Sequence, residues 1–214
     1  MTKKKFWQLE YSITLFVILG LIMLFVPLKI ENYFQAGMIS KWNDRYNKVA
    51  YMFTVINAQT DDEILKSFAA AKTPEQREKL LLQLVKPYLR IHQSDKFPKR
   101  YRPKFMNGDR VPKDNYYYFN EFYFADNGMH VVGIKDIVKH ENNAPWFMMM
   151  FDINGVLPPN TWGKDIFGIY ILDEGKIRPF GYEKSMDALA EDCSENGTGV
   201  DCSYFYRIGG EFND

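Results

Sequence analysis

The sequence predicts an α+β protein in which a long N-terminal helix precedes an antiparallel β-sheet. Three observations lead to this fold class. Residues 6–28 form one apolar run, residues 29–91 show helical periodicity, and most tyrosines and phenylalanines fall after residue 100. Aromatic residues are enriched in strands, and helices followed by strands are the order of an α+β fold. We therefore divide the chain into a leader (1–5), an apolar helix (6–28), helical segments (29–91) and a sheet domain (92–214).

The apolar run is long enough to cross a membrane. It reads FWQLEYSITLFVILGLIMLFVPL and carries no charge after Glu10. An α-helix over residues 11–28 rises about 27 Å, close to the hydrocarbon thickness of a bilayer. Three lysines at positions 3–5 precede it, and such positive flanks stay cytoplasmic. No small-x-small cleavage site of a secretory signal follows the run, so we expect a single-pass transmembrane helix with its N-terminus in the cytoplasm.

Residues 29–58 carry the stripe of an amphipathic helix, because apolar side chains recur every three or four positions. The stripe consists of Ile30, Phe34, Met38, Trp42, Tyr46, Val49, Phe53 and Ile56. Two short helices are expected next, over residues 61–71 and 73–87. The second has threonine at the cap and proline at the first helical position, which is a strong start signal. We expect these helices to pack on the domain.

The second half of the chain alternates between aromatic or β-branched runs and turn residues, as strands and hairpins do. The expected strands are Tyr116–Phe124, Met129–Ile134, Trp146–Phe151, Ile166–Leu172, a short piece near Ile177, and Ser203–Ile208. In an exported domain the two cysteines, Cys193 and Cys202, predict a local disulfide, with two free buried thiols as the alternative. A disulfide closing so short a loop stabilises a fold by about 2.5–3 kcal/mol in the chain-entropy model.

The composition argues against several function classes. The formal net charge is zero, which does not suit a general polyanion binder. The three histidines, at positions 92, 130 and 140, lack metal-ligand spacing, and no G-x-S-x-G, P-loop or dinucleotide glycine pattern occurs. We therefore expect that the protein is not an enzyme.

Residues 95–114 form a basic stretch in which cations alternate with aromatic residues. Its members are Lys96, Lys99, Arg100, Arg102, Lys104, Arg110 and Lys113, with Phe97, Tyr101 and Phe105 between them. Such a pattern can contact DNA phosphates and bases. The pattern favours a solvated loop that meets an acidic surface on a neighbour. The C-terminal region offers one in Asp187, Glu191, Asp192, Glu195 and Asp201.

The N-terminal pattern as a set resembles that of type IV pilins and type II secretion pseudopilins. It combines a basic leader, Phe6, the carboxylate of Glu10, an apolar run and Pro27. In that family a prepilin peptidase cuts before the phenylalanine and the new, methylated amine pairs with the glutamate of a neighbouring subunit. The proline bends the helix where it leaves the membrane. The resemblance implies processing between Lys5 and Phe6, although the family has glycine where this chain has Lys5.

A second segment strengthens the resemblance. Residues 152–167 read DINGVLPPNTWGKDIF and are similar to a loop between two strands of many bacterial pilin-like proteins. The loop carries oxygen ligands on Asp152, Asn154, Asn160 and Asp165, and calcium takes six to eight oxygens. Major pseudopilins hold calcium in a loop near the end of the sheet, so the resemblance implies a candidate calcium site. The favoured alternative is that these side chains cap turns and bond backbone amides.

The resemblance implies a structural subunit of a type IV pilus or a type II secretion pseudopilus-like filament. Such a subunit waits in the bacterial inner membrane, with its domain on the periplasmic or extracellular side. An inner-membrane assembly platform then extracts it, and its apolar helix packs with other subunits, in a filament that can reach the cell surface. The alternative is a single-pass anchored protein that never polymerises and whose outer domain binds a ligand or an envelope partner. Lys5 supports this alternative.

Overall fold

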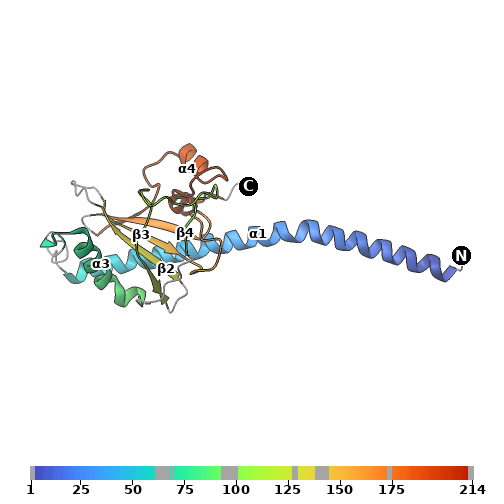
Figure 1. The fold of residues 1–214 in the computed structure, drawn as a ribbon, viewed down its shortest axis with the longest axis horizontal. Coiled ribbons are helices and arrows are strands. Elements are labelled where there is room, and N and C mark those ends of the chain that lie inside the picture. Colours follow the sequence, from blue (N-terminus) through green and yellow to red (C-terminus); the bar gives the residue numbers. More distant parts are fainter. Residues whose placement is uncertain are drawn as a thin grey trace. The chain divides into compact units, whose positions relative to one another are not determined.

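Figure 1 shows the computed structural model of the 214-residue chain. It describes residues 3–60, 68, 70–92, 101–126, 130–137, 145–172 and 175–211, with the backbone alone for residues 3–10, 24–32, 60 and 145. The chain divides into two units, Met1–Gly37 and Met38–Asp214.

Helix α1 (Lys3–Thr60) contains 58 residues and continues through position 27. Within the first unit, every described side chain from position 11 to position 23 is exposed, including the large apolar residues Phe16 and Met23. Among the side chains that the structure describes, no helix holds a window both long and apolar enough to cross a membrane. The prediction that the apolar run and the amphipathic stripe are both helical is confirmed at the level of the backbone.

Within the second unit, α1 buries most of the predicted stripe. The buried members are Met38, Trp42, Val49, Phe53 and Ile56, joined by Met52. Tyr46 is half-buried, Phe34 in the first unit is exposed, and the side chain of Ile30 lies outside the described residues. This buried face packs on the sheet, because the ring of Trp42 stacks on Phe167 with 4.9 Å between ring centroids.

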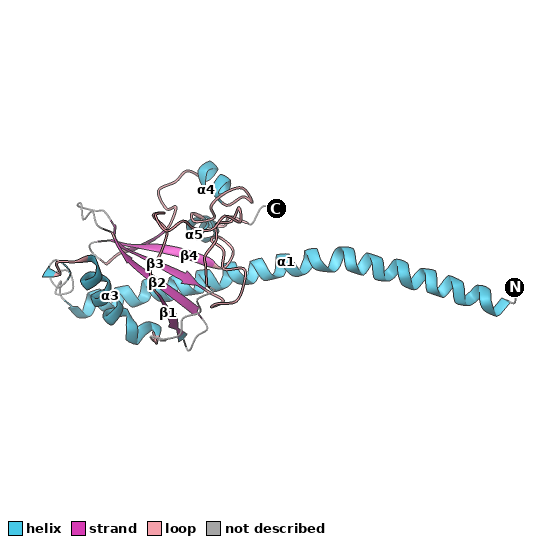
Figure 2. Ribbon diagram, viewed as in Figure 1, coloured by secondary structure: helices cyan, strands magenta, loops and turns pink. Residues whose placement is uncertain are grey.

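The sheet has five antiparallel strands in the order of the sequence, β1-β2-β3-β4-β5 (Figure 2). The strands are β1 (Phe122–Ala125), β2 (His130–Asp136), β3 (Pro145–Asp152), β4 (Ile166–Leu172) and β5 (Ile177–Pro179). Each strand pairs with the next one in the chain, so the sheet is a simple meander. The predicted α+β class, with helices first and an antiparallel sheet afterwards, is confirmed.

Both faces of the sheet are covered, and β3 shows this most directly. Its residues Phe147, Met149 and Phe151 join the core formed with α1 and α3. The alternate residues, Met148 and Met150, join a second core with Tyr101, Phe105, Val111 and Phe119 from the preceding loop. Successive strand residues point to opposite faces, so an apolar run without alternation belongs to a strand buried on both sides.

Helix α3 (Pro74–Leu89) begins as predicted, since the Thr73 side chain accepts a hydrogen bond from the Gln76 amide and proline follows the cap. It extends two residues beyond Pro87. Arg77 in α3 forms two hydrogen bonds, of 2.9 and 2.8 Å, with the buried carboxylate of Asp136 at the end of β2. This bidentate pair holds α3 on the sheet. Of the helix predicted over residues 61–71, most residues lie outside the described part.

One strand prediction is wrong, and another is correct only at its C-terminal end. Ser203–Ile208 forms the short helices α5 (Cys202–Phe205) and η2 (Tyr206–Ile208), which follow α4 (Met186–Asp192). A short apolar run does not distinguish helix from strand, and here tertiary contacts select the helix. The buried Ser203 hydroxyl accepts a hydrogen bond from the Gly168 amide in β4 and donates one to Val200.

The partly correct prediction concerns the first strand, which begins at Phe122 instead of Tyr116. Asn115 accounts for the difference, because its side-chain oxygen accepts a hydrogen bond from the Tyr117 amide at 2.8 Å. Its backbone carbonyl accepts another from Tyr118. An asparagine that bonds the backbone two residues ahead turns the chain, and this local bond competes with strand pairing.

Candidate functional site

The processing and assembly residues predicted from the sequence all fall in α1. Lys5, Phe6, Glu10 and Pro27 have helical backbone, and their side chains lie outside the described residues. Their predicted roles therefore stay predictions.

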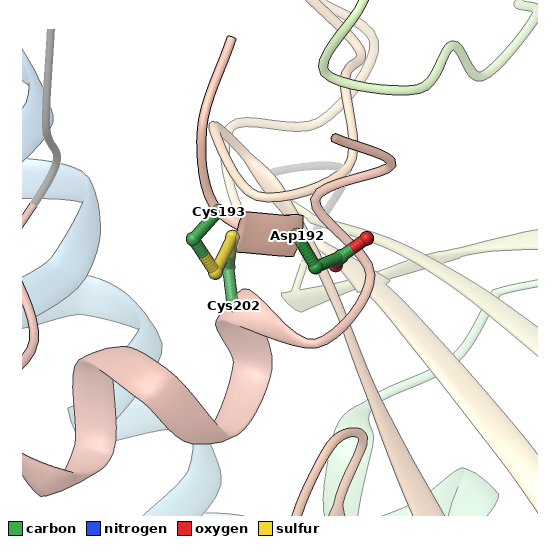
Figure 3. A group of neighbouring side chains, drawn as sticks. All are labelled: Asp192, Cys193 and Cys202. Carbon is green, nitrogen blue, oxygen red and sulfur yellow. A yellow bond between two sulfur atoms is a disulfide. The ribbon is translucent and has the colours of Figure 1, made fainter. Parts of the chain in front are cut away.

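The predicted disulfide between Cys193 and Cys202 is confirmed, and Figure 3 shows it. Cys193 caps the C-terminus of α4, and Cys202 is the first residue of α5, with their Cα atoms 5.4 Å apart. Both side chains are buried. The disulfide thus joins the end of α4 to the start of α5, the helix that begins where the last strand was predicted.

A carboxylate oxygen of Asp192 lies within 4.8 Å of the two sulfur atoms (Figure 3). Within the described part of the chain, these three side chains are close enough together to be considered as ligands of one metal ion. The sulfur atoms are bonded to each other and are not available as thiolate ligands. The Asp192 carboxylate accepts hydrogen bonds from the Thr198 amide and hydroxyl and from the Asp201 amide. The disulfide and the hydrogen bonds of Asp192 therefore hold the ends of the loop between α4 and α5 together, which is a structural role.

The loop between β3 and β4 brings the four predicted oxygen ligands together. Asp152 ends β3 and Asp165 directly precedes β4, and both carboxylates are fully buried. Asp152 Oδ1 accepts a hydrogen bond from the Asn154 amide at 3.3 Å, and Asp165 Oδ2 accepts one from the Asn160 amide at 2.8 Å. The Asn154 side-chain amide lies against the Asp165 carboxylate.

The backbone of this loop requires the residue types that the sequence places there. Asn160 has a φ of 51° and Gly163 a φ of 79°, in the left-handed region that asparagine and glycine tolerate best. A Cβ atom on Gly163 would also contact the Met106 side chain and the Cys202 sulfur. The glycine therefore allows the loop to pack closely on both the basic stretch and the disulfide.

Burial changes the protonation of the two carboxylates. It raises the pKa of Asp165 from its ordinary value of 3.8 to about 6, against the opposing effect of hydrogen bonds from the Thr161 and Asn160 amides. Burial raises the pKa of Asp152 well above its ordinary value, and the charge of nearby Asp165 adds to this effect. Neither carboxylate forms an ion pair with a described residue. The loop therefore holds two carboxyl groups whose charged forms the burial disfavours and no described cation stabilises.

Two further oxygens in the loop are left without partners. The side-chain oxygens of Asn154 and Asn160 are buried, and within the described residues neither accepts a hydrogen bond. Buried polar atoms are normally satisfied, and such exceptions point to an ion or a water. Two carboxylates and two amide oxygens have the chemistry that a hard cation such as calcium prefers. The backbone hydrogen bonds of the aspartates also match the alternative prediction of capped turns.

Sequence reasoning missed Tyr101, which takes part in the same loop. Its buried hydroxyl donates a hydrogen bond to Asp152 Oδ2 at 3.0 Å, across 51 positions of the sequence. The backbone of Lys104 also exchanges hydrogen bonds with residues 160 and 162. No pattern in the sequence pairs these segments, since the contact depends on how the basic stretch crosses the sheet.

The basic stretch is only partly the solvated loop that the sequence predicts, and residues 95–100 lie outside the described part. Tyr101, Phe105 and Val111 are buried in the second core. Their neighbours Arg102, Lys104, Arg110 and Lys113 are exposed. In the acidic C-terminal region, Asp192 and Asp201 are bound internally, and Asp201 pairs with Lys184 at 2.5 Å. Asp187, Glu191 and Glu195 are exposed.

The fold and the loop define the class of the molecule as an α+β protein with a long N-terminal helix and a five-stranded antiparallel meander. Comparisons with protein-family models, with curated proteins and with solved structures find no match to the chain.

Proposed function

We propose that this chain is a structural subunit of a filament of the type IV pilus or type II secretion pseudopilus kind. The observation that carries the proposal is the 58-residue helix α1. Its N-terminal part presents an uncharged apolar surface, and its C-terminal part is built into the core of an antiparallel sheet domain. Such a helix can serve at one end as a membrane anchor and filament core and at the other end as the support of the domain.

The exposed apolar part of α1 is the first support. The described side chains from position 11 to position 23 carry no charge and are all exposed, with Phe16 at 76% and Met23 at 75% exposure. Large contiguous apolar surfaces on a protein mark sites that lipid or another protein covers. Lipid before assembly and neighbouring copies of the same helix after assembly both satisfy this requirement.

The firm attachment of α1 to its domain is the second support. Trp42 Nε1 donates a hydrogen bond to the Ser203 carbonyl at 2.8 Å, and Arg45 pairs with Asp126 at 2.6 Å. The guanidinium of Arg207 lies 3.8 Å from the centroid of the Tyr46 ring. These contacts join the C-terminal part of α1 to segments that are far away in the sequence. This part of the helix and the sheet domain therefore form one folded unit.

In this proposal Glu10 fixes the position of each subunit relative to its neighbour along the filament. A carboxylate buried in a helical bundle without a partner is strongly disfavoured, so each subunit is positioned where a neighbour offers a positive group. A methylated N-terminal amine at Phe6 is that group. The partners are then other subunits of the filament, an inner-membrane assembly platform and a prepilin peptidase, and nucleic acid is not among them.

The second candidate function is a single-pass anchored protein that stays monomeric and whose outer domain binds a ligand. The observation in its favour is Lys5, which stands where a prepilin peptidase normally finds glycine. The two functions differ in the state of the N-terminus.

Mass spectrometry of the native protein is expected to show a methylated N-terminus that begins at Phe6. The peptidase reads the residue before the cut, so the Lys5→Gly variant should be processed at least as completely as the native chain. A native chain that keeps Met1 or Thr2, with no methylation at position 6, contradicts the filament proposal. If only Lys5→Gly is cut, Lys5 is the block and the anchored alternative holds.

We also propose that the loop of residues 152–165 binds calcium as a structural ion. Asp152, Asn154, Asn160 and Asp165 would hold it. The buried side-chain oxygens of Asn154 and Asn160, which lack hydrogen-bond partners among the described residues, are the observation that favours it. Calcium would neutralise the two buried carboxylates, whose charge the fold otherwise disfavours.

Calcium at millimolar concentration is expected to raise the melting temperature of the full-length protein in detergent by several degrees at pH 7.5. The folded-state pKa of Asp165 lies above its ordinary value, at about 6. Its contribution to stability is therefore present below pH 4 and is lost as the pH rises through 6. Since calcium replaces protons on these carboxylates, its stabilising effect should be larger at pH 7.5 than at pH 5.

Asn154→Ala removes one unpaired oxygen and should abolish the calcium shift, whereas Asn196→Ala, at an exposed position, should leave it unchanged. Magnesium prefers a rigid octahedral shell and should give a smaller shift. Equal melting temperatures with calcium and with a chelator would refute the calcium proposal and leave capped turns as the role of the loop.

A further inference from the structure

A pocket of about 570 Å³ lies at the second face of the sheet, in the part of the chain that the structure describes. Three short segments line it, at residues 101–103, 110–113 and 117–119, together with Phe122. The first two segments belong to the basic stretch, and the third leads into β1. Pockets for small ligands commonly have volumes of about 300–1,000 Å³, so this one has room for a ring-sized ligand.

The pocket is positively charged. Arg102, Arg110 and Lys113 line it, and among the described residues no carboxylate does. None of these three cations forms an ion pair with a described residue, in contrast to Arg45 and Arg77, which pair with aspartates. A concave surface that carries one sign of charge focuses the electric field and attracts ions of the opposite sign. The charge of the pocket is therefore available for an anion.

The walls of the pocket are aromatic and held by the core. Phe119 is buried, and its ring packs so closely on Gly133 in β2 that a Cβ atom there would lie 2.9 Å from Phe119 Cδ1. The rings of Tyr101 and Phe122 meet edge to face at 4.9 Å. Tyr117 packs against Phe180 on the same side, with 5.3 Å between ring centroids. Because the core fixes these rings, the pocket is formed before any ligand arrives.

We propose that this pocket binds a ring-shaped anion of the sugar-acid or sugar-phosphate class. Guanidinium groups match carboxylates and phosphates through paired hydrogen bonds. The aromatic side chains of the lining present apolar rings, which suit the apolar C–H face of a sugar, while the cations meet its acidic group. The pocket is concave and has the volume of a small-ligand pocket, which favours such a unit over the extended backbone of DNA or the flat acidic surface of a protein. The proposal does not depend on whether the chain polymerises.

Isothermal titration calorimetry of the full-length protein in detergent tests the proposal with defined probes. Trigalacturonate supplies a carboxylate on a sugar ring, glucose 6-phosphate supplies a phosphate, and maltotriose is the neutral control. At least one of the two anionic probes is expected to bind with a Kd on the order of 0.1 mM, and maltotriose should not bind. The stronger anionic probe then identifies which acid group the pocket accepts. Raising the salt concentration should weaken binding.

Two variants and a matched control assign the binding to this pocket. Arg110→Gln and Lys113→Gln remove exposed charges and should each weaken the binding of the anionic probe about tenfold, since hydrogen bonds to charged groups are strong. Lys79→Gln removes an exposed charge from α3 and should change nothing. Unchanged melting temperatures verify that the variants are folded.

Three results would overturn the proposal. Maltotriose could bind as tightly as the anions, the Lys79→Gln control could lose as much affinity as the pocket variants, or neither anionic probe could bind. A single-stranded oligonucleotide that binds where both sugars fail would assign the basic pocket to nucleic acid, and the sugar-anion proposal would be withdrawn.

Discussion

The Glu10→Ala variant is expected to insert into the membrane normally and to be absent from filaments. Removing a carboxylate makes the apolar run more hydrophobic, so insertion should not suffer. Assembly should fail because the positive group of the neighbouring subunit is left buried without its partner, which is strongly destabilising. Membrane fractionation measures the first effect, and the amount of the subunit in sheared or purified filaments measures the second.

Two control variants separate charge from position in this experiment. Glu10→Gln keeps the shape and the hydrogen-bonding capacity of the side chain, so it should fail to assemble if charge pairing is what matters. Glu31→Ala removes a carboxylate beyond the apolar run and should assemble normally. Filaments that contain Glu10→Ala at native levels would remove the register role of Glu10 and weaken the filament proposal.

The largest expected loss of stability follows from Trp42→Ala. Trp42 is fully buried, stacks on Phe167 and donates a hydrogen bond to the Ser203 carbonyl at 2.8 Å. Truncating a buried large aromatic residue costs about 3–5 kcal/mol, and leaving the Ser203 carbonyl unpaired adds to that cost. Because stability is typically about 5–15 kcal/mol, the domain should be close to unfolding at physiological temperature.

Denaturant unfolding of the full-length protein in detergent, followed by near-ultraviolet circular dichroism, measures this effect. Trp42→Phe keeps most of the buried ring and should cost clearly less than alanine. Tyr51→Ala lies on the same helix at a position that is 72% exposed, so it should change the unfolding free energy by less than about 0.5 kcal/mol. A Trp42→Ala protein within 1 kcal/mol of the native stability (roughly the cost of an average substitution) would show that α1 does not depend on this anchor.

The same residue illustrates what a sequence reveals about a helix. The spacing of Met38, Trp42 and Val49 predicts both the helix and its buried face, and the structure buries all three. Periodicity works here because the face of a helix follows from its 3.6-residue turn alone. The partners of that face, Phe167 in β4 and Ser203 in α5, lie more than 120 positions away, and the spacing of the apolar residues in the helix does not predict them.

The strands were predictable where each pairs with the next strand of the chain and where turn residues in the adjacent sequence mark its ends. Ile166–Leu172 agrees with the structure at both ends, because an apolar run is bounded by polar turn residues there. Ser203–Ile208 is predicted as a strand and is helical, since Phe205 and Tyr206 join the core, where the Tyr206 ring packs against Phe167 of β4 instead of extending the sheet. Composition alone cannot distinguish these two outcomes for so short a run.

The loop of residues 152–165 shows the same division within the candidate site. Its aspartates and asparagines were predictable as a set of oxygen ligands or turn caps, because those residue types have few other uses in a glycine- and proline-rich loop. The burial that raises the pKa of Asp165 to about 6, and the hydrogen bond from Tyr101 to Asp152, arise only when the basic stretch crosses the second face of the sheet.

By itself the sequence determined that helices come first and antiparallel strands follow, the buried face of α1 and the pairing of Cys193 with Cys202, because each depends on neighbours within a few turns of chain. Only the tertiary structure decided that the C-terminal aromatic run is helical and that both faces of β3 are covered. It alone also brought three cations and a set of aromatic rings together into one pocket. The physical reason is that contacts across the sheet join segments whose separation in sequence carries no local signal.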